Sequence, residues 1–207
     1  MSSSAHPRKG RPVDAAKREA IVAAAARAFF TDGFAAASIE QIAADAGVSK
    51  VTVYNQFGDK RGLFTAAVEA ECNRMQTYFS IDTSTGATLR DRLRSIGTGM
   101  VAFLSRPEMI QFERRIAAET VAEPEIGDAF LAAGPHRMKK AFAQFLRALA
   151  DAGDVEIADF DLAAEQFASM CKGMGDLERR FGAKVDPQRD RDRVEAAVEV
   201  FCRAYGR

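Results

Sequence analysis

A short polar segment in the first third of the chain carries side chains suited to nucleic acid. Lys50 can donate to the O6 and N7 acceptors of guanine, and Asn55 can pair with adenine. Thr52, Tyr54 and Gln56 are donors that suit phosphate oxygens. The chemistry open to this segment is therefore recognition of base edges and of the sugar-phosphate backbone.

Helical periodicity divides the same segment into two faces. Val53 and Phe57 are four residues apart and are predicted to point inward together with Val48. Val51 then lies beside Tyr54 on the opposite face, which is unusual for a solvated surface but suits contact with thymine methyl groups. The predicted outward face comprises Lys50, Val51, Tyr54 and Asn55.

The elements that must position these residues form a helix-turn-helix over residues 38–57. Ser38 is a good N-cap for a very short helix, and Gln41 completes the pattern of a capping box. Gly47 permits a tight turn, and Ser49 caps the following helix. A short helix held in this way can enter the major groove of DNA.

Two further helices complete the head of the chain. The first is predicted over residues 14–31 and ends at Gly33. The other runs from Lys60 to about residue 79, where Lys60 could hold a phosphate with help from the helix dipole. Residues 1–12 are predicted to be a disordered basic tail, in which Arg11 enters a minor groove, follows phosphates or is only solvated.

The order of small and aromatic residues over residues 11–70 resembles the DNA-binding domain of the TetR family of bacterial transcriptional regulators. The shared features are Arg11, Ala28-Phe29, Gly33-Phe34, Ser38-Ile39, Ile42-Ala43, Gly47-Val48-Ser49, Tyr54, Phe57, Lys60 and Leu63-Phe64. The resemblance implies that this outward face touches DNA, although Asn55 and Gln56 depart from the residues frequent there. The candidate DNA-binding residues are Arg11, Ser38, Ser49, Lys50, Val51, Thr52, Tyr54, Asn55, Gln56 and Lys60.

Composition and charge fit a two-part chain of 207 residues. Residues 1–62 carry nine Lys or Arg against six acids, whereas the whole chain is neutral, so a basic head adjoins an acidic body. The three cysteines are far apart and are predicted to be reduced thiols. No apolar run could span a membrane or act as a signal peptide, so we expect a cytoplasmic protein, associated with the nucleoid when bound to DNA.

Helical spacing of apolar residues recurs along almost the whole chain, which predicts an all-α fold of about nine to ten helices. We expect a three-helix head with the helix-turn-helix in residues 13–75. Residues 76–207 are predicted to form a helical body for ligand binding and dimerisation. Part of this body, residues 130–173, resembles the C-terminal domain of multidrug-type TetR members.

The body is rich in Phe and Met, which suits either an ordinary helical core or a cavity for an apolar ligand. The candidate cavity residues are Phe103, Phe112, Ile116, Phe142 and Met170. Polar groups that could orient a ligand are Glu113, Arg114, His136 and Arg137. The last two helices are expected to dimerise, with small residues such as Gly173 and Gly175 allowing close approach. The candidate dimer residues are Met174, Val194, Val198 and Phe201.

The sequence holds no catalytic constellation, phosphate-binding loop or metal-ligand spacing, so we expect no enzyme activity, no cofactor and no metal. The resemblance implies a repressor that binds a palindromic operator as a homodimer and is released by a small hydrophobic effector. Its expected partners are double-stranded DNA, that effector and a second copy, but no membrane. Two alternatives remain: a TetR-like protein that acts through protein partners without an effector, and a helical enzyme using carboxylates.

Overall fold

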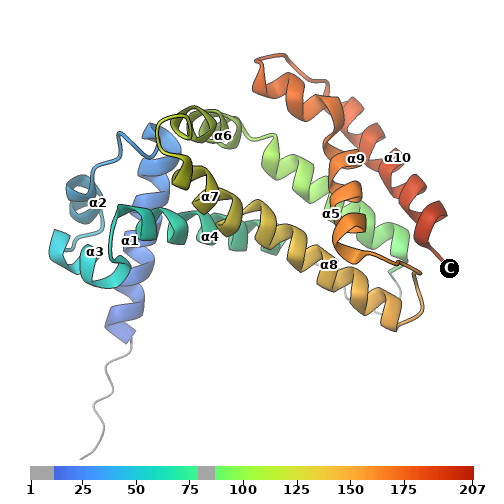
Figure 1. The fold of residues 1–207 in the computed structure, drawn as a ribbon, viewed down its shortest axis with the longest axis horizontal. Coiled ribbons are helices and arrows are strands. Elements are labelled where there is room, and N and C mark those ends of the chain that lie inside the picture. The colour runs from blue at the N-terminus through green and yellow to red at the C-terminus, as the bar shows by residue number, and fades with distance from the viewer. Residues whose placement is uncertain (1–11, 79–86) are drawn as a thin grey trace, which may run out of the picture.

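The computed structural model describes residues 12–78 and 87–207, which form helices joined by short connections (Figure 1). The only β pairing within these ranges is one antiparallel bridge between Val155 and Gly206. The helices are α1 (Pro12–Asp32), α2 (Ile39–Asp45), α3 (Lys50–Phe57), α4 (Lys60–Tyr78), α5 (Leu89–Leu104), α6 (Pro107–Glu119), α7 (Pro124–Ala133), α8 (Pro135–Asp151), α9 (Phe160–Arg180) and α10 (Pro187–Tyr205). The predicted all-α fold is confirmed, and no helix in the described ranges is long and apolar enough to cross a membrane.

The head and the body share one apolar cluster. Helices α1, α2 and α3 lie together at one end of the molecule, and α9 and α10 lie at the other end (Figure 1). Phe29 of α1 packs edge-on against Phe64 of α4, and Phe64 in turn contacts Phe112 of α6. The core of the head therefore continues into the body through α4 and α6.

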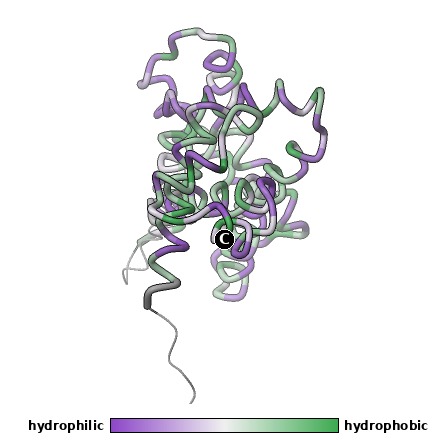
Figure 2. Tube along the Cα trace, turned by 90° about the vertical axis from the view of Figure 1, so that its left-hand side faces the viewer, coloured by the Kyte–Doolittle hydropathy of each residue, from purple (hydrophilic) through white to green (hydrophobic). Residues whose placement is uncertain are grey.

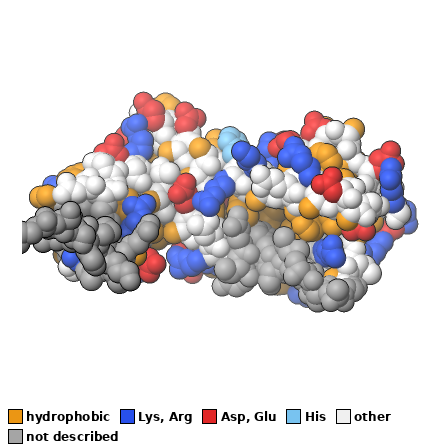
Figure 3. Space-filling model, turned by 90° about the horizontal axis from the view of Figure 1, so that it is seen from below, with side chains coloured by type: hydrophobic (Ala, Val, Ile, Leu, Met, Phe, Trp, Pro, Cys, Tyr) orange, Lys and Arg blue, Asp and Glu red, His pale blue; other side chains and the backbone are white. Residues whose placement is uncertain are grey.

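A second apolar cluster holds the far end of the body together. Phe167 of α9 and Phe201 of α10 pack edge to face with their ring centroids 5.3 Å apart. Leu93 of α5 and Leu146 of α8 are fully buried in the same cluster. Hydrophobic and hydrophilic stretches alternate along the chain in Figure 2, as expected when each helix buries one face. The face shown in Figure 3 mixes acidic and basic side chains, in keeping with the neutral net charge.

Helix α9 bends at Gly173, whose φ of 45° and ψ of −152° are not helical. The space beside Gly173 and Gly175 is filled by the side chain of Arg193 from α10 of the same chain. Arg193 pairs with the buried carboxylate of Asp190 at 2.8 Å, and Arg179 pairs with the other oxygen of Asp190. The small residues that suggested close approach of a partner helix thus accommodate an arginine of the protomer itself.

The predicted helix caps are present, with one exception. The Ser49 hydroxyl accepts from the Thr52 amide at 3.2 Å. Asp59, which precedes α4, accepts in the same way from the Gly62 amide at 2.7 Å. The Ser38 hydroxyl accepts from the Gln41 amide at 3.4 Å. The prediction of a capping box was wrong, because the Gln41 side chain donates to Asp45 at 2.7 Å instead of turning back to Ser38.

Two glycines with positive φ set the turns of the head. Gly33 has a φ of 89° and ends α1, as predicted, and Gly47 has a φ of 66° between α2 and α3. A Cβ on Gly33 would lie 2.5 Å from the Glu119 carboxylate, whereas a Cβ on Gly47 would meet nothing within 4 Å. Both positions need glycine for backbone reasons, but only Gly33 also needs it for space.

We expect Gly33→Ala to lower the free energy of unfolding by about 2–4 kcal/mol and Gly47→Ala by only about 1 kcal/mol. Both substitutions strain the backbone, but only the first displaces Glu119. Urea denaturation followed by circular dichroism measures both. Equal losses for the two variants would show that the contact between Gly33 and Glu119 does not matter.

Candidate functional site

The outer face of α3 exposes apolar side chains to solvent. Val51 is 66% exposed and Tyr54 is 41% exposed, whereas Val53 is 1% exposed. Asn55 is exposed beside them, and Phe57 is half-buried against the core of the head. The two predicted faces of this helix are therefore confirmed as an orientation.

Lys50 lies at the start of this face and is paired with Glu40 of α2. The hydrogen bond to Glu40 raises the pKa of the Lys50 ammonium, which also lies 5.7 Å from the centre of the Tyr54 ring. Both charged groups are largely exposed, so the pair contributes little to stability. Lys50 can exchange this partner for a stronger acceptor at little cost.

Contacts at both ends of α3 hold this helix in position. The hydroxyls of Ser49 and Thr52 are 2.9 Å apart, so the capping serine and Thr52 form one small cluster at the start of α3. At the other end, the Arg18 guanidinium lies 4.5 Å from the centre of the Phe57 ring and 3.5 Å from the carbonyl of Gln56. These contacts fix α3 against α1 and hold its outer face in place.

Lys60 fixes the connection between α1 and α2. Its ammonium donates to the Ala35 carbonyl at 3.0 Å and lies 4.9 Å from the centre of the Phe34 ring. Burial lowers the pKa of Lys60, against the opposing effect of nearby Glu119. Its role as a phosphate ligand stays a prediction, and it now has a second role in shaping the head. Arg11 lies outside the described residues.

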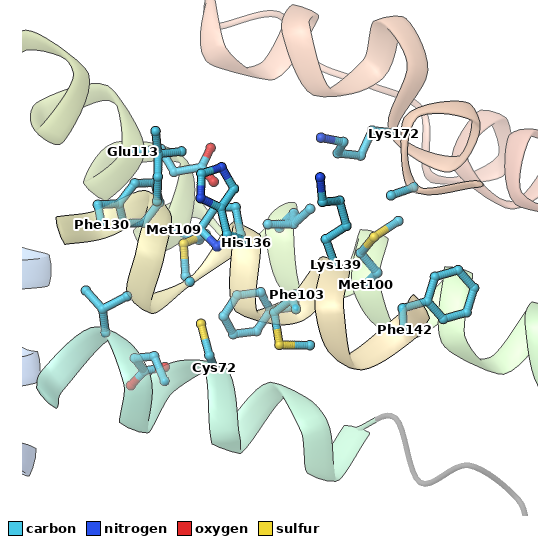
Figure 4. A pocket seen from close by; sticks show the side chains of 18 of the residues that line it. Cys72, Met100, Phe103, Met109, Glu113, Phe130, His136, Lys139, Phe142 and Lys172 are labelled. Atoms are coloured by element: carbon cyan, nitrogen blue, oxygen red, sulfur yellow. The ribbon is translucent and has the colours of Figure 1, made fainter. Parts of the chain in front are cut away.

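A cavity of about 840 Å³ lies in the body beside the head (Figure 4). Four of the five predicted residues line it, namely Phe103, Phe112, Ile116 and Phe142. Met170 does not line this cavity and instead packs half-buried against the second apolar cluster. A space of this size, lined mainly by apolar side chains, is typical of a site for a small molecule.

Head residues that the sequence analysis missed also line this cavity. Phe30 of α1 stacks on Phe112, with the ring centroids 3.9 Å apart and the ring planes 7° from parallel. Val68 and Cys72 of α4 contribute as well, and burial raises the pKa of the Cys72 thiol to about 11. The DNA-binding unit predicted from the sequence therefore forms part of the cavity wall.

Only two of the four predicted orienting groups line the cavity, Glu113 and His136. Burial raises the pKa of Glu113, and this is opposed by the Arg180 guanidinium 3.1 Å away. Arg137 turns away and donates to Asn73 at 2.8 Å. In the part of the chain that is described, no three His, Cys, Asp or Glu side chains are grouped to hold a metal ion.

Helix α6 connects this cavity to the head by hydrogen bonds as well as by packing. The Arg115 guanidinium donates to the Phe30 carbonyl at 3.1 Å and to the Thr31 carbonyl at the end of α1. The Glu119 carboxylate accepts from the amides of Phe34 at 3.0 Å and Ala35 at 3.3 Å. Because of these hydrogen bonds, a shift of α6 would also displace the connection between α1 and α2.

An apolar stripe along the second half of α9 and its C-cap residue, Phe181, is exposed to solvent. Met174 is 62% exposed and Phe181 is 84% exposed, and Leu177 between them is also exposed. The other predicted dimer residues, Val194, Val198 and Phe201, are instead fully covered within the protomer by the second apolar cluster. Of the four predicted dimer residues, only Met174 is therefore exposed on the surface of the protomer.

Both halves of the chain match models of known protein families. Residues 21–67 match the family model for bacterial regulatory proteins of the tetR family, and residues 91–207 match the model for the C-terminal domain of AefR-like transcriptional repressors. No match was found among proteins with curated descriptions.

Solved structures of regulators are similar over nearly the whole length. A TetR-family regulator from Mesorhizobium loti is 28% identical, covers 95% of this chain and 100% of its own, and has a TM-score of 0.79. The flavonoid-responsive regulator FrrA is 30% identical, with 92% and 97% coverage and a TM-score of 0.72. A TetR-family regulator from Pseudomonas syringae is 28% identical, with 92% and 96% coverage and a TM-score of 0.60.

Proposed function

Since the chain belongs to the TetR family of bacterial transcriptional regulators, whose members bind DNA, we propose that it is an effector-controlled repressor. In this proposal a homodimer binds a palindromic operator in the cytoplasm and a small hydrophobic molecule releases it. The observation that carries the DNA-binding part is the outer face of α3, where Val51 and Tyr54 stay exposed beside Lys50.

The outer face of α3 suits the major groove. An exposed Val51 gains by packing on thymine methyl groups, and Asn55 can pair with adenine beside it. Lys50 leaves Glu40 and donates to guanine, because the exposed ion pair contributes little free energy and the surrounding phosphates attract the ammonium. Tyr54, Thr52 and Gln56 bind the backbone at the edges of the groove.

The α9 stripe supports the proposed dimer. Met174, Leu177 and Phe181 follow helical spacing and leave a continuous apolar strip in solvent, which costs free energy unless it is covered. A two-fold axis through this strip would bring two copies of the same residues together. Two recognition helices would then meet half-sites about 34–36 Å apart, one turn of DNA.

The cavity supports the proposed effector. Its lining is mainly Phe, Met and other apolar side chains, and it is large enough for a molecule of several rings. The similar regulator FrrA is described as flavonoid-responsive, so planar aromatic compounds are a reasonable first class to test.

Two connections can carry the signal from the cavity to the head. Helix α4 presents Val68 and Cys72 to the cavity and begins next to α3. Helix α6 presents Phe112 and Ile116 to the cavity and holds the end of α1 through Arg115. A ligand that fits one arrangement of these helices better than the other would shift the distance between the two recognition helices.

Selection from a pool of random DNA duplexes tests the proposed function. The purified protein should enrich duplexes with an inverted repeat whose half-sites are about one helical turn apart. Recovery of unrelated sequences in every round would contradict specific operator binding. It would favour the alternative of a TetR-like protein that acts through protein partners.

A further inference from the structure

Ionisable side chains are few in the cavity lining, and most are already paired. The acids are Glu71, Glu113 and Glu165, and the Lys and Arg residues are Lys139, Lys172 and Arg180. Their pairing decides which charge a ligand would meet, because a charge in an apolar site needs a partner.

Two of the three acids form ion pairs with arginines. Glu113 pairs with Arg180 at 3.1 Å. Glu71 pairs with Arg74 and lies 3.5 Å from Arg106, and neither of these arginines lines the cavity. Arg180 also pairs with Asp176 at 3.1 Å, so Glu113 shares its partner with a second acid.

The two lysines of the lining differ from each other in their ion pairing. The Lys139 ammonium of α8 donates to Glu165 at 3.4 Å, and this carboxylate is itself mostly exposed. Lys172 of α9 has no acid within ion-pair distance among the residues that the structure describes. The lining holds three acids and three Lys or Arg side chains, and Lys172 is the one of these six without an ion pair among the described residues.

The side chains of the two lysines also point toward each other. Figure 4 shows their side chains extending from α8 and α9 with the ammonium ends converging, above Met100 and Phe103. His136, one helical turn before Lys139, lies on the same side of the cavity. An apolar space with two convergent ammonium groups at its edge has the form of a site for an amphipathic anion.

We propose that the effector is an organic anion, with an aromatic or aliphatic body in the cavity and a carboxylate or similar oxyanion held between Lys139 and Lys172. This inference rests on the proposed role of the cavity as the effector site. The anion would take the place of the exposed Glu165 as the partner of Lys139 and would give Lys172 a partner. Charge-assisted hydrogen bonds to two ammonium groups would then select acids over uncharged analogues.

Two fluorescent probes with the same ring system test the proposal. These are 8-anilinonaphthalene-1-sulfonate, which is anionic, and N-phenyl-1-naphthylamine, which is uncharged. We expect the intact protein to bind the anionic probe at least about tenfold more tightly. In the double variant Lys139→Gln/Lys172→Gln this preference should disappear, with the affinity for the uncharged probe unchanged.

Matched variants locate the effect. Lys140→Gln removes an exposed lysine adjacent to Lys139 that does not line the cavity, and it should leave both affinities unchanged. Ala168→Trp and Ala141→Phe each fill part of the cavity, so they should weaken both probes together. Unchanged melting temperatures confirm that each variant is folded.

The outcomes separate the two proposals. If both probes bind with equal affinity and respond to cavity filling but not to the lysine variants, the anion site is wrong and the apolar effector cavity stands. If neither probe binds, or cavity filling affects neither, the proposed effector site itself is overturned, and the anion proposal with it.

Discussion

Val51→Glu is expected to weaken operator binding by at least about 100-fold without changing the melting temperature of the protein. Val51 is mostly exposed on α3, so the substitution removes little packing and should change stability by no more than about 0.5 kcal/mol. In the complex, however, the new carboxylate would face base acceptors and phosphates. The lost methyl contact and the added repulsion together cost about 3 kcal/mol or more. Fluorescence anisotropy with labelled operator DNA measures the affinity.

Gln144→Glu is the matched control for this variant. Gln144 is exposed on α8, away from the cavity lining and far along the chain from the head, and the change adds the same charge in a side chain of almost the same shape. We expect it to alter operator affinity by less than about twofold, since a distant exposed charge is screened by salt. Equal losses for the two variants would mean that net charge, and not the α3 face, determines DNA binding.

Met174→Glu/Leu177→Glu is expected to convert the proposed dimer to a monomer. The α9 stripe would then carry four carboxylates across a two-fold interface, where they would be desolvated next to each other. A monomer carries one recognition helix instead of two, so operator affinity should fall by about 100-fold or more. Sedimentation equilibrium measures the oligomeric state, and anisotropy measures the affinity.

The control for the dimer variant is Val121→Glu/Ala122→Glu. It places two acids on another exposed stretch, in the turn after α6, and should leave the oligomeric state unchanged. If the α9 variant stays dimeric, the proposed interface is misplaced. If it becomes monomeric and still binds the operator with full affinity, two-fold recognition of DNA is wrong.

The two faces of α3 could be predicted because the information is local. A helix of eight residues has one buried stripe, and the four-residue spacing of Val53 and Phe57 defines it. Gly33 and Gly47 could be predicted as turns for the same reason, since a positive φ is a property of one residue. Local rules also fail in places. The Gln41 side chain donates to Asp45 and does not form the capping box with Ser38 that the sequence pattern predicts.

The cavity was only partly predictable, because apolar periodicity identifies an inner face but not what that face meets. Phe112 and Ile116 could be predicted as inner residues of the body, but nothing local indicates that Phe30 stacks on Phe112 from the head. The contacts of Glu119 with Phe34 and Ala35 join positions more than 80 residues apart. Such contacts are set by the tertiary fold alone.

The predicted dimer residues show the same limit. Val194, Val198 and Phe201 form an apolar stripe on α10 that would suit either a partner or the chain's own core, and the structure places them in the core. Arg193 illustrates why sequence spacing misleads here. Its side chain occupies the space beside Gly173 and Gly175 that a partner helix was predicted to use.

Sequence-specific DNA binding through α3 is tested most directly by two affinities of the purified protein. One is for its selected inverted repeat, and the other is for a duplex of the same composition in shuffled order. Anisotropy titrations at physiological salt should give at least about a 1000-fold preference for the repeat. Titration at saturating concentration should give two chains per duplex. Equal affinity for the two duplexes would contradict the claim that this chain reads DNA through the exposed face of α3.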